Sequence, residues 1–286
     1  MTAVIWGGTF IAGRMISRDV LPFSAACLRF TIASIFLILV CLKRYGRLPE
    51  IKREHFVHLI FLGLSGIFLY NFCFFLGLKH INASRAALII ATNPVFISLF
   101  SSVIFKDRLS LFKVLGICLS VFGAIVVISR GDLSTITSTG FGLGELLIFG
   151  CVASWVTYSL LGKSVMKTIS PLTAVTYSSI IGTCCLFFAA LPEGILVTIT
   201  NLKLANWIGL FYLGFFGTVL GFIWYYQGIQ KIGAARASQF INFVPLSAII
   251  LAFFILNEPI TKSIIAGGSL VVAGVYLTNF RMKNSK

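Results

Sequence analysis

The sequence is poor in charged residues, and above all in acidic ones. Asp, Glu, Lys and Arg make up 11% of the 286 residues, and only 8 residues are acidic, whereas about 25% of the residues of a typical soluble domain are charged. The chain is 58% hydrophobic and has a mean hydropathy of +1.00. These values argue against a water-soluble fold and indicate that the lipid bilayer is the solvent of this protein.

The groups that catalysis usually needs are also scarce. His55, His58 and His80 lie at the ends of apolar runs, and Glu145 is the one carboxylate inside such a run. A membrane-embedded active site would need a nucleophile, an acid and a base at membrane depth. We therefore expect no enzyme activity, no catalytic residues and no cofactor.

The 7 cysteines lie inside apolar runs and lack the paired spacing of metal ligands. We interpret them as small core residues, so neither disulfides nor a metal site are expected.

The apolar residues fall into ten runs of 16 to 23 residues. A helix of about 20 apolar residues crosses the hydrocarbon layer, and runs of this length cannot leave backbone groups unpaired in lipid. The expected fold is therefore an all-α membrane protein of ten transmembrane helices. The predicted spans are 2–17, 23–42, 56–78, 84–105, 113–129, 142–161, 171–192, 206–227, 236–256 and 263–280.

The basic residues predict an orientation. A net charge of +15 would suggest a nucleic-acid partner in a soluble protein, but these residues lie in short connectors, so no nucleic-acid binding is expected. Connectors on one side of the membrane hold fifteen Lys and Arg, and those on the other hold seven. The positive-inside rule then predicts two cytoplasmic termini. Ten spans without long loops suit a multi-pass protein of the bacterial inner (plasma) membrane.

The chain also repeats itself. A shift of 151 residues places the segment 77–123 on the segment 228–274 without a gap, and a shift of 149 places Trp6 on Trp155. The first shift aligns Gly77 with Gly228, Arg85 with Arg236, Pro94 with Pro245, Asp107 with Glu258 and Gly123 with Gly274. We predict two five-helix repeats, 1–130 and 131–286. Because five spans reverse the direction of the chain, the second repeat is inverted, as in many secondary transporters.

Several motifs carry a family resemblance over essentially the whole chain. They are WGGTF at 6–10, CLRF at 27–30, ASRAALIIATNP at 83–94, KDRLSLFKVLGICLSVFGAIVV at 106–127, AARASQFINFVP at 234–245 and NEPITKSIIAGGSLVVAGVYL at 257–277. The sequence resembles the ten-helix EamA branch of the drug/metabolite transporter superfamily. The resemblance implies bacterial inner-membrane transport of amino acids, metabolites or toxic compounds. It also implies a central cavity lined by the first, third, fourth, sixth, eighth and ninth helices.

Two prolines point to a site within the membrane. Pro94 and Pro245 occupy equivalent spans, where each removes a backbone hydrogen bond and kinks or opens the helix. The alternative is a fixed bend that only serves packing. Asn93, Gln239 and Asn242 place amides near the same depth, and buried amides must face protein or a cavity.

Four charged residues have two interpretations each. Arg29 either binds an anionic group such as a carboxylate or reaches the outer headgroups. Glu145 either takes up a proton or is an acid favoured at a helix start. Arg85 and Arg236 begin equivalent spans on opposite sides of the membrane, where they act as gate residues or contact headgroups.

Aromatic and polar side chains supply candidate cavity surface. Trp6 and Trp155 are favoured because the repeat makes them equivalent and both lie in mid-span; membrane aromatics otherwise often serve as interface anchors or packing. The other candidates are Thr9, Tyr70, Asn71, Tyr158 and Trp224. Such groups suit an amphipathic metabolite.

The sequence thus predicts a secondary transporter that works by alternating access. Its substrate is expected to be a small amphipathic metabolite such as an amino acid, with export as the expected direction. A proton gradient or an exchanged counter-substrate would drive transport, and the lipid bilayer is the other partner. The alternatives are a channel or a membrane-embedded enzyme without transport activity.

Overall fold

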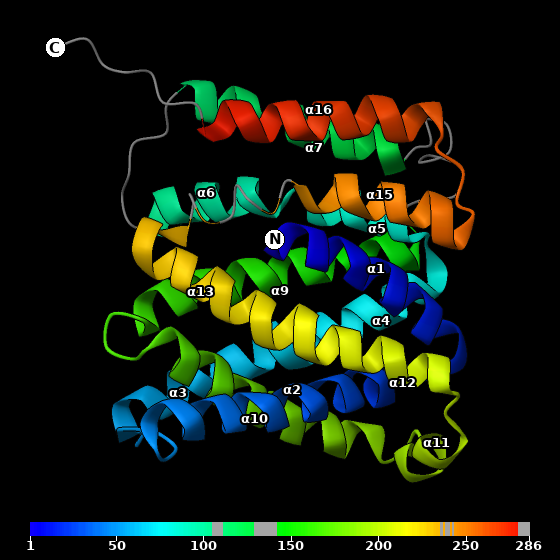
Figure 1. The fold of residues 1–286 in the computed structure, drawn as a ribbon. Helices are drawn as coiled ribbons and strands as arrows, with labels where there is room; N and C mark the ends of the chain where they lie inside the picture. Colours follow the sequence, from blue (N-terminus) through cyan, green and yellow to red (C-terminus); the bar gives the residue numbers. More distant parts are fainter. Residues whose placement is uncertain (105–110, 129–141, 235–236, 238–240, 242, 280–286) are drawn as a thin grey trace, which may run out of the picture.

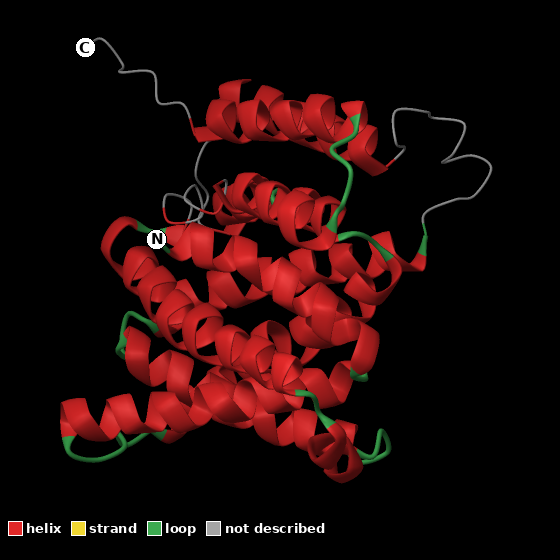
Figure 2. Cartoon of the chain, turned by 45° about the vertical axis from the view of Figure 1, so that its right-hand side comes forward, coloured by secondary structure: helices red, strands yellow, loops and turns green. Residues whose placement is uncertain are grey.

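The computed structural model describes residues 1–104, 111–128, 142–234, 237, 241 and 243–279. Every regular element in this part of the chain is a helix, as predicted (Figure 2). In chain order the elements are α1 (Thr2–Asp19), α2 (Pro22–Tyr45), α3 (Arg53–Leu62), η1 (Gly63–Leu69), α4 (Tyr70–His80), α5 (Ala83–Ile90), α6 (Asn93–Ile104), α7 (Leu111–Ile128), α9 (Leu143–Val165), α10 (Pro171–Ala190), α11 (Ile195–Asn201), α12 (Leu204–Phe211), η2 (Tyr212–Leu220), α13 (Gly221–Ile232), α15 (Phe243–Leu256) and α16 (Lys262–Asn279).

Each predicted span contains at least one of these helices. Six helical segments are long and apolar enough to cross a membrane by length and composition. They are Pro22–Tyr45, Arg53–His80, Ala83–Ile104, Leu143–Val165, Pro171–Ala190 and Leu204–Ile232. The helices α1, α7, α15 and α16 are outside this set, so the count of ten spans remains a prediction. The short helix α11 was not predicted.

The helices lie roughly alongside one another, and α7 and α16 form a separate layer at one edge (Figure 1). We call the end of the bundle at which α1 begins, with Thr2, the near end. The end at which α1 stops, with Asp19, is the far end. The α2–α3 and α9–α10 connections lie at the near end, and the α1–α2, α4–α5 and α15–α16 connections lie at the far end (Figure 1).

Two long helices each contain a π-helical stretch. The stretch η1 interrupts the helix that runs from Arg53 to His80, and η2 interrupts the helix that runs from Leu204 to Ile232. The two stretches begin at Gly63 and Tyr212, which are 149 residues apart, the same shift that aligns Trp6 with Trp155. Because π-helical turns are rare and are frequent at functional sites, they direct attention to the residues around them.

The helix that contains Pro94 is interrupted, as predicted. The helix α5 ends at Ile90, a turn follows at residues 91 and 92, and α6 begins at Asn93. The Thr92 backbone N–H and hydroxyl both donate to the Ile89 carbonyl oxygen, at 3.1 and 2.7 Å. Pro94 cannot donate to the Ile90 carbonyl oxygen, because proline has no N–H.

The edge pair of α7 and α16 is held by close backbone contact. A Cβ atom on Gly267 would lie 2.6 Å from the Gly123 carbonyl oxygen, so no larger residue fits without a backbone shift. The Ser120 hydroxyl donates to the Val271 carbonyl oxygen at 3.2 Å. Small residues at a helix crossing favour such contacts within lipid, and here they join two helices of one chain.

We predict that Gly267→Ala destabilises the protein and that Gly268→Ala does not. Both changes improve helix propensity, but the Gly267 methyl group meets the backbone, and overpacking of this kind costs about 1–3 kcal/mol. The Gly268 methyl group would meet only the end of the Leu88 side chain, at 3.2 Å. Thermal unfolding of the two purified variants tests this; equal midpoints would contradict the close contact.

Candidate functional site

Two adjoining pockets lie within the bundle and share Trp6 and Ile241. The central pocket has a volume of about 40 Å³ and is lined by Trp6, Thr9, Phe10, Arg29, Tyr70, Phe74, Ile90, Asn93, Trp155, Phe222, Ile241 and Val244. The near-end pocket has a volume of about 130 Å³ and is lined by Thr2, Ala3, Trp6, Trp224, Tyr225, Gly228, Ile232, Ala237 and Ile241. Helices from both predicted repeats form the walls of each pocket.

Arg29, on α2, contributes the charge of the central pocket. Its side chain is buried, and its guanidinium donates from Nε to the Thr218 hydroxyl at 3.2 Å and from Nη1 to the Asn71 side-chain oxygen at 2.9 Å. Thr218 lies in η2. Asn71 lies in the first turn of α4, two residues after η1, and its side-chain amide donates to the Ile67 carbonyl oxygen within η1. Both π-helical stretches therefore serve to position Arg29. The buried guanidinium is directed at protein groups of η2 and α4.

The WGGTF motif brings α1 against its neighbours. The Trp6 indole donates to the Gly217 carbonyl oxygen at 2.8 Å, and Gly217 lies in η2. A side chain at Gly8 would collide with the Tyr212 hydroxyl, which donates to the Ile5 carbonyl oxygen at 2.8 Å. Gly7 approaches Ser247 of α15 as closely. The motif thus combines two glycines of close approach with three residues that line the central pocket, at positions 6, 9 and 10.

The rings of Trp6, Tyr70, Trp155 and Phe222 form an aromatic wall of the central pocket, with Trp155 at its centre. The Trp155 ring centroid lies 5.4 Å from that of Trp6, 5.4 Å from that of Tyr70 and 5.2 Å from that of Phe222. Tyr158 lies behind this wall, fully buried and stacked on Tyr226 at 4.9 Å, and it lines neither pocket. The wall has apolar faces and few polar edges, which suits an amphipathic ligand.

Asn93 lies beside the helix break and lines the central pocket. Its side chain is 1% exposed, and its oxygen accepts no hydrogen bond from the described residues. Buried amides are normally satisfied, so an unsatisfied one in a pocket is a candidate ligand contact. Pro94 and Pro245 are themselves buried and line neither pocket, although Asn93 and Val244, their neighbours, do.

At the far end, side-chain contacts tie the helices together. Glu145, in the first turn of α9, forms an ion pair with Arg85 of α5 at 2.8 Å, away from both pockets. The Glu258 carboxylate, beyond α15, accepts hydrogen bonds from the Ala83 and Ser84 backbone N–H groups at 2.9 and 3.1 Å and from the Ser84 hydroxyl at 2.7 Å. This carboxylate therefore caps the start of α5 from the connection between α15 and α16.

A second carboxylate repeats this arrangement. Glu193, beyond α10, accepts from the Phe23 and Ser24 backbone N–H groups at 3.1 and 2.7 Å and from the Ser24 hydroxyl at 2.8 Å, at the start of α2. Sequence analysis found neither cap. Each cap joins residues about 170 positions apart in the chain, and no local sequence pattern indicates such a contact.

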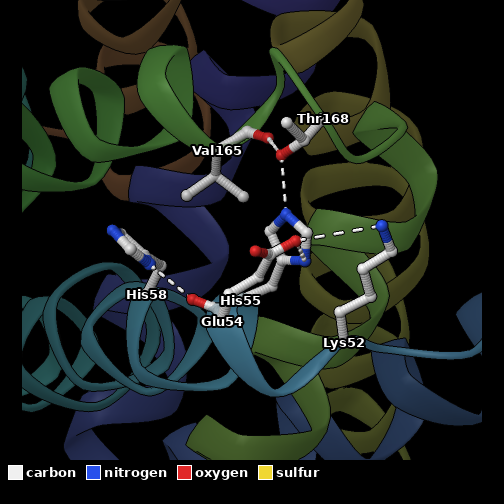
Figure 3. Close-up of polar contacts among 6 residues, drawn as sticks. All are labelled: Lys52, Glu54, His55, His58, Val165 and Thr168. Carbon is white, nitrogen blue, oxygen red and sulfur yellow. Dashed lines mark hydrogen bonds and ion pairs between the residues drawn. The ribbon is translucent and has the colours of Figure 1, made fainter.

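The histidines lie away from the pockets. At the near end, His55 Nε2 lies 2.8 Å from the Thr168 hydroxyl, and His58 Nδ1 lies 3.2 Å from the Glu54 carbonyl oxygen (Figure 3). The Glu54 carboxylate and the Lys52 ammonium are 4.0 Å apart (Figure 3). These contacts join the start of α3 to the connection after α9. Among the described residues, no three His, Cys, Asp or Glu side chains gather as metal ligands would.

The structure thus brings Trp6, Thr9, Arg29, Tyr70, Asn93 and Trp155 together around one pocket and places Trp224 at the other. Asn71 lines neither pocket, and its side-chain oxygen accepts a hydrogen bond from Arg29. Gln239, Asn242 and Arg236 lie outside the described residues. Sequence analysis missed the apolar lining residues Phe10, Phe74, Ile90, Phe222, Ile241 and Val244, because one apolar residue among many carries no distinguishing signal.

Fold and pockets together define a helical, multi-pass membrane protein with two adjoining pockets between its helices. The sequence model of the EamA-like transporter family matches residues 1–129 and 142–280. The chain belongs to this family, within the drug/metabolite transporter superfamily.

Relatives of the chain are named as transporters. An uncharacterized transporter of Bacillus subtilis, YyaM, is 32% identical over 273 residues, covering 96% of this chain and 89% of the relative. A probable terminal-alkyne amino-acid exporter of Streptantibioticus cattleyicolor is 25% identical over 281 residues, covering 98% of this chain and 92% of the relative. A solved crystal structure superimposes with a TM-score of 0.70 at 20% identity, covering 97% of this chain and 95% of that one, which shows the same fold.

Proposed function

We propose that this protein is a secondary transporter that carries a small amphipathic metabolite, such as an amino acid, across the bacterial inner membrane. The observation that carries the proposal is the central pocket, which is lined by Arg29, Asn93 and the aromatic wall. Export as the direction draws on a relative that is named as a probable terminal-alkyne amino-acid exporter.

The proposed architecture is two inverted five-helix repeats, 1–130 and 131–286, with both termini cytoplasmic. Two π-helical stretches 149 residues apart support it, as do the two segments matched by the family model. Inverted repeats allow two conformations, open to opposite sides, around one site. A proton gradient or an exchanged counter-substrate supplies the driving force in this scheme.

The contacts at the two ends suggest which conformation the structure represents. The far end is tied by the Arg85–Glu145 ion pair and by the Glu258 cap on α5. The near-end pocket lies where α1 begins and α13 ends. We therefore assign a conformation closed at the far end, and we infer that these far-end contacts break when the site faces the opposite side.

The transport proposal predicts saturable uptake by the purified protein in proteoliposomes, measured with pooled labelled amino acids and small metabolites, with and without a proton gradient. Trp155→Ala removes the centre of the aromatic wall, so we expect its half-saturation concentration to rise about tenfold or more, as for other buried aromatic anchors.

The matched control is Trp207→Ala, because Trp207 is a partly buried tryptophan of α12 that lines neither pocket; its uptake should resemble that of the unmodified protein. Flux that never saturates would favour the channel. No flux for any pool, by a protein that is folded, would argue against a carrier of these substrates.

The proposed far-end closure makes a separate prediction. Glu258→Ala removes the carboxylate that holds α5 to the end of α15, so we expect a cysteine placed at Ile81, now 7% exposed, to react several-fold faster with a thiol reagent that does not cross membranes. Glu193→Ala is the control, because it removes an equivalent cap from α2. If both variants change the labelling rate equally, Glu258 has no particular role in closure.

A further inference from the structure

We propose that the central pocket binds the carboxylate group of the substrate, that Arg29 is its positive partner, and that the near-end pocket holds an apolar tail. The substrates would then be amphipathic carboxylates, including apolar amino acids, and would exclude the corresponding amines. This inference rests on the proposed transport function and specifies the chemical class of its substrate.

The first argument is the distribution of charge. Placing a charge within a membrane protein is costly unless it is paired or hydrated. None of the described carboxylates is paired with Arg29. Each makes a contact elsewhere: Asp19 with Asn206, Glu50 with Arg47, Glu54 with Lys52, Glu145 with Arg85, Glu193 with Ser24 and Glu258 with Ser84. The chain's other two carboxylates, Asp107 and Asp132, lie outside the described residues.

The second argument is the way in which Arg29 is held. The acceptors of its two hydrogen bonds, on Thr218 and Asn71, are neutral, so they fix the guanidinium without cancelling its charge. Its third nitrogen, Nη2, makes no hydrogen bond with the described residues, and Arg29 lines the pocket. A planar guanidinium with a free donor is well suited to a carboxylate.

The third argument is size. The central pocket, at about 40 Å³, is the smaller of the two, and it is the one that Arg29 and Asn93 line. The near-end pocket is larger, at about 130 Å³, and its walls include Ile232, Ala237 and Trp224. Trp6 and Ile241 line both pockets, so the two adjoin, and the proposal requires that a bound molecule extends past Trp6 from one into the other.

A cation is the competing ligand, because aromatic faces such as that of Trp155 attract ammonium groups. The uncompensated charge of Arg29 on the same pocket repels a cation and attracts an anion, and its effect is strengthened where water is excluded. The unsatisfied oxygen of Asn93 remains available for a hydrogen-bond donor of the ligand, such as the amino group of an amino acid.

The test uses three ligand pools that share the side chains of leucine, isoleucine, valine and methionine. The first contains the amino acids, the second the deaminated acids and the third the decarboxylated amines. The readout is the thermal unfolding midpoint of the purified protein, which a bound ligand raises. We expect both carboxylate pools to raise the midpoint by at least about 2 °C and the amine pool to leave it unchanged.

Two variants test whether Arg29 recognises the carboxylate or only supports the structure. Arg29→Gln should abolish the shift caused by the carboxylate pools. The matched control, Arg14→Gln, should retain it, because Arg14 of α1 donates to the Leu78 carbonyl oxygen and lines neither pocket. If Arg29→Gln does not fold, the comparison of the three pools on the unmodified protein still decides the matter.

The inference is overturned if the amines bind as well as the acids, if neither carboxylate pool shifts the midpoint, or if both arginine variants lose the shift equally. These outcomes leave the transport proposal standing when uptake of some other pool is saturable. Conversely, binding of carboxylates without any flux would support the subsite and count against the carrier.

Discussion

The buried guanidinium of Arg29 imposes the constraint on which the centre of this structure depends. A charge at that depth needs acceptors from the protein, because lipid offers none. Thr218 and Asn71 supply them; Thr218 lies within η2, and Asn71 lies two residues after η1. Neither acceptor carries a charge, so the network orients the guanidinium and leaves its charge available to a ligand.

The same region joins elements that are far apart in the sequence. Trp6 of α1 donates to the backbone of η2, and Thr218 of η2 holds Arg29 of α2. Movement of η2 relative to α2 would therefore act on the charge and on the aromatic wall together. The two π-helical stretches thus lie beside the proposed binding pocket, and π-helical turns are frequent at functional sites.

Sequence analysis predicted the fold class well because membrane helices have strong signals. The length of the apolar runs and the break beside Pro94 follow from local composition, whereas the two five-helix repeats remain a prediction. Arg29 and Asn93 were identified because a polar residue within an apolar run is conspicuous.

The parts that sequence analysis missed depend on contacts between distant residues. Nothing local to Glu258 or Glu193 indicates that each caps another helix, and nothing in an apolar run distinguishes Phe222 of the cavity from a phenylalanine that faces lipid. Tyr158, which sequence analysis proposed as cavity surface, lines neither of the two pockets. Spacing places it near Trp155, but the packing turns it toward Tyr226, behind the wall.

The central claim is that one site between the helices is exposed to each side of the membrane in turn, and counterflow tests it most directly. Vesicles that contain the protein and are loaded with an unlabelled apolar amino acid are diluted into a trace of the labelled compound. The account predicts that label transiently accumulates inside above its external concentration. A label that only equilibrates, at a rate that internal substrate does not change, would contradict alternating access and indicate a channel.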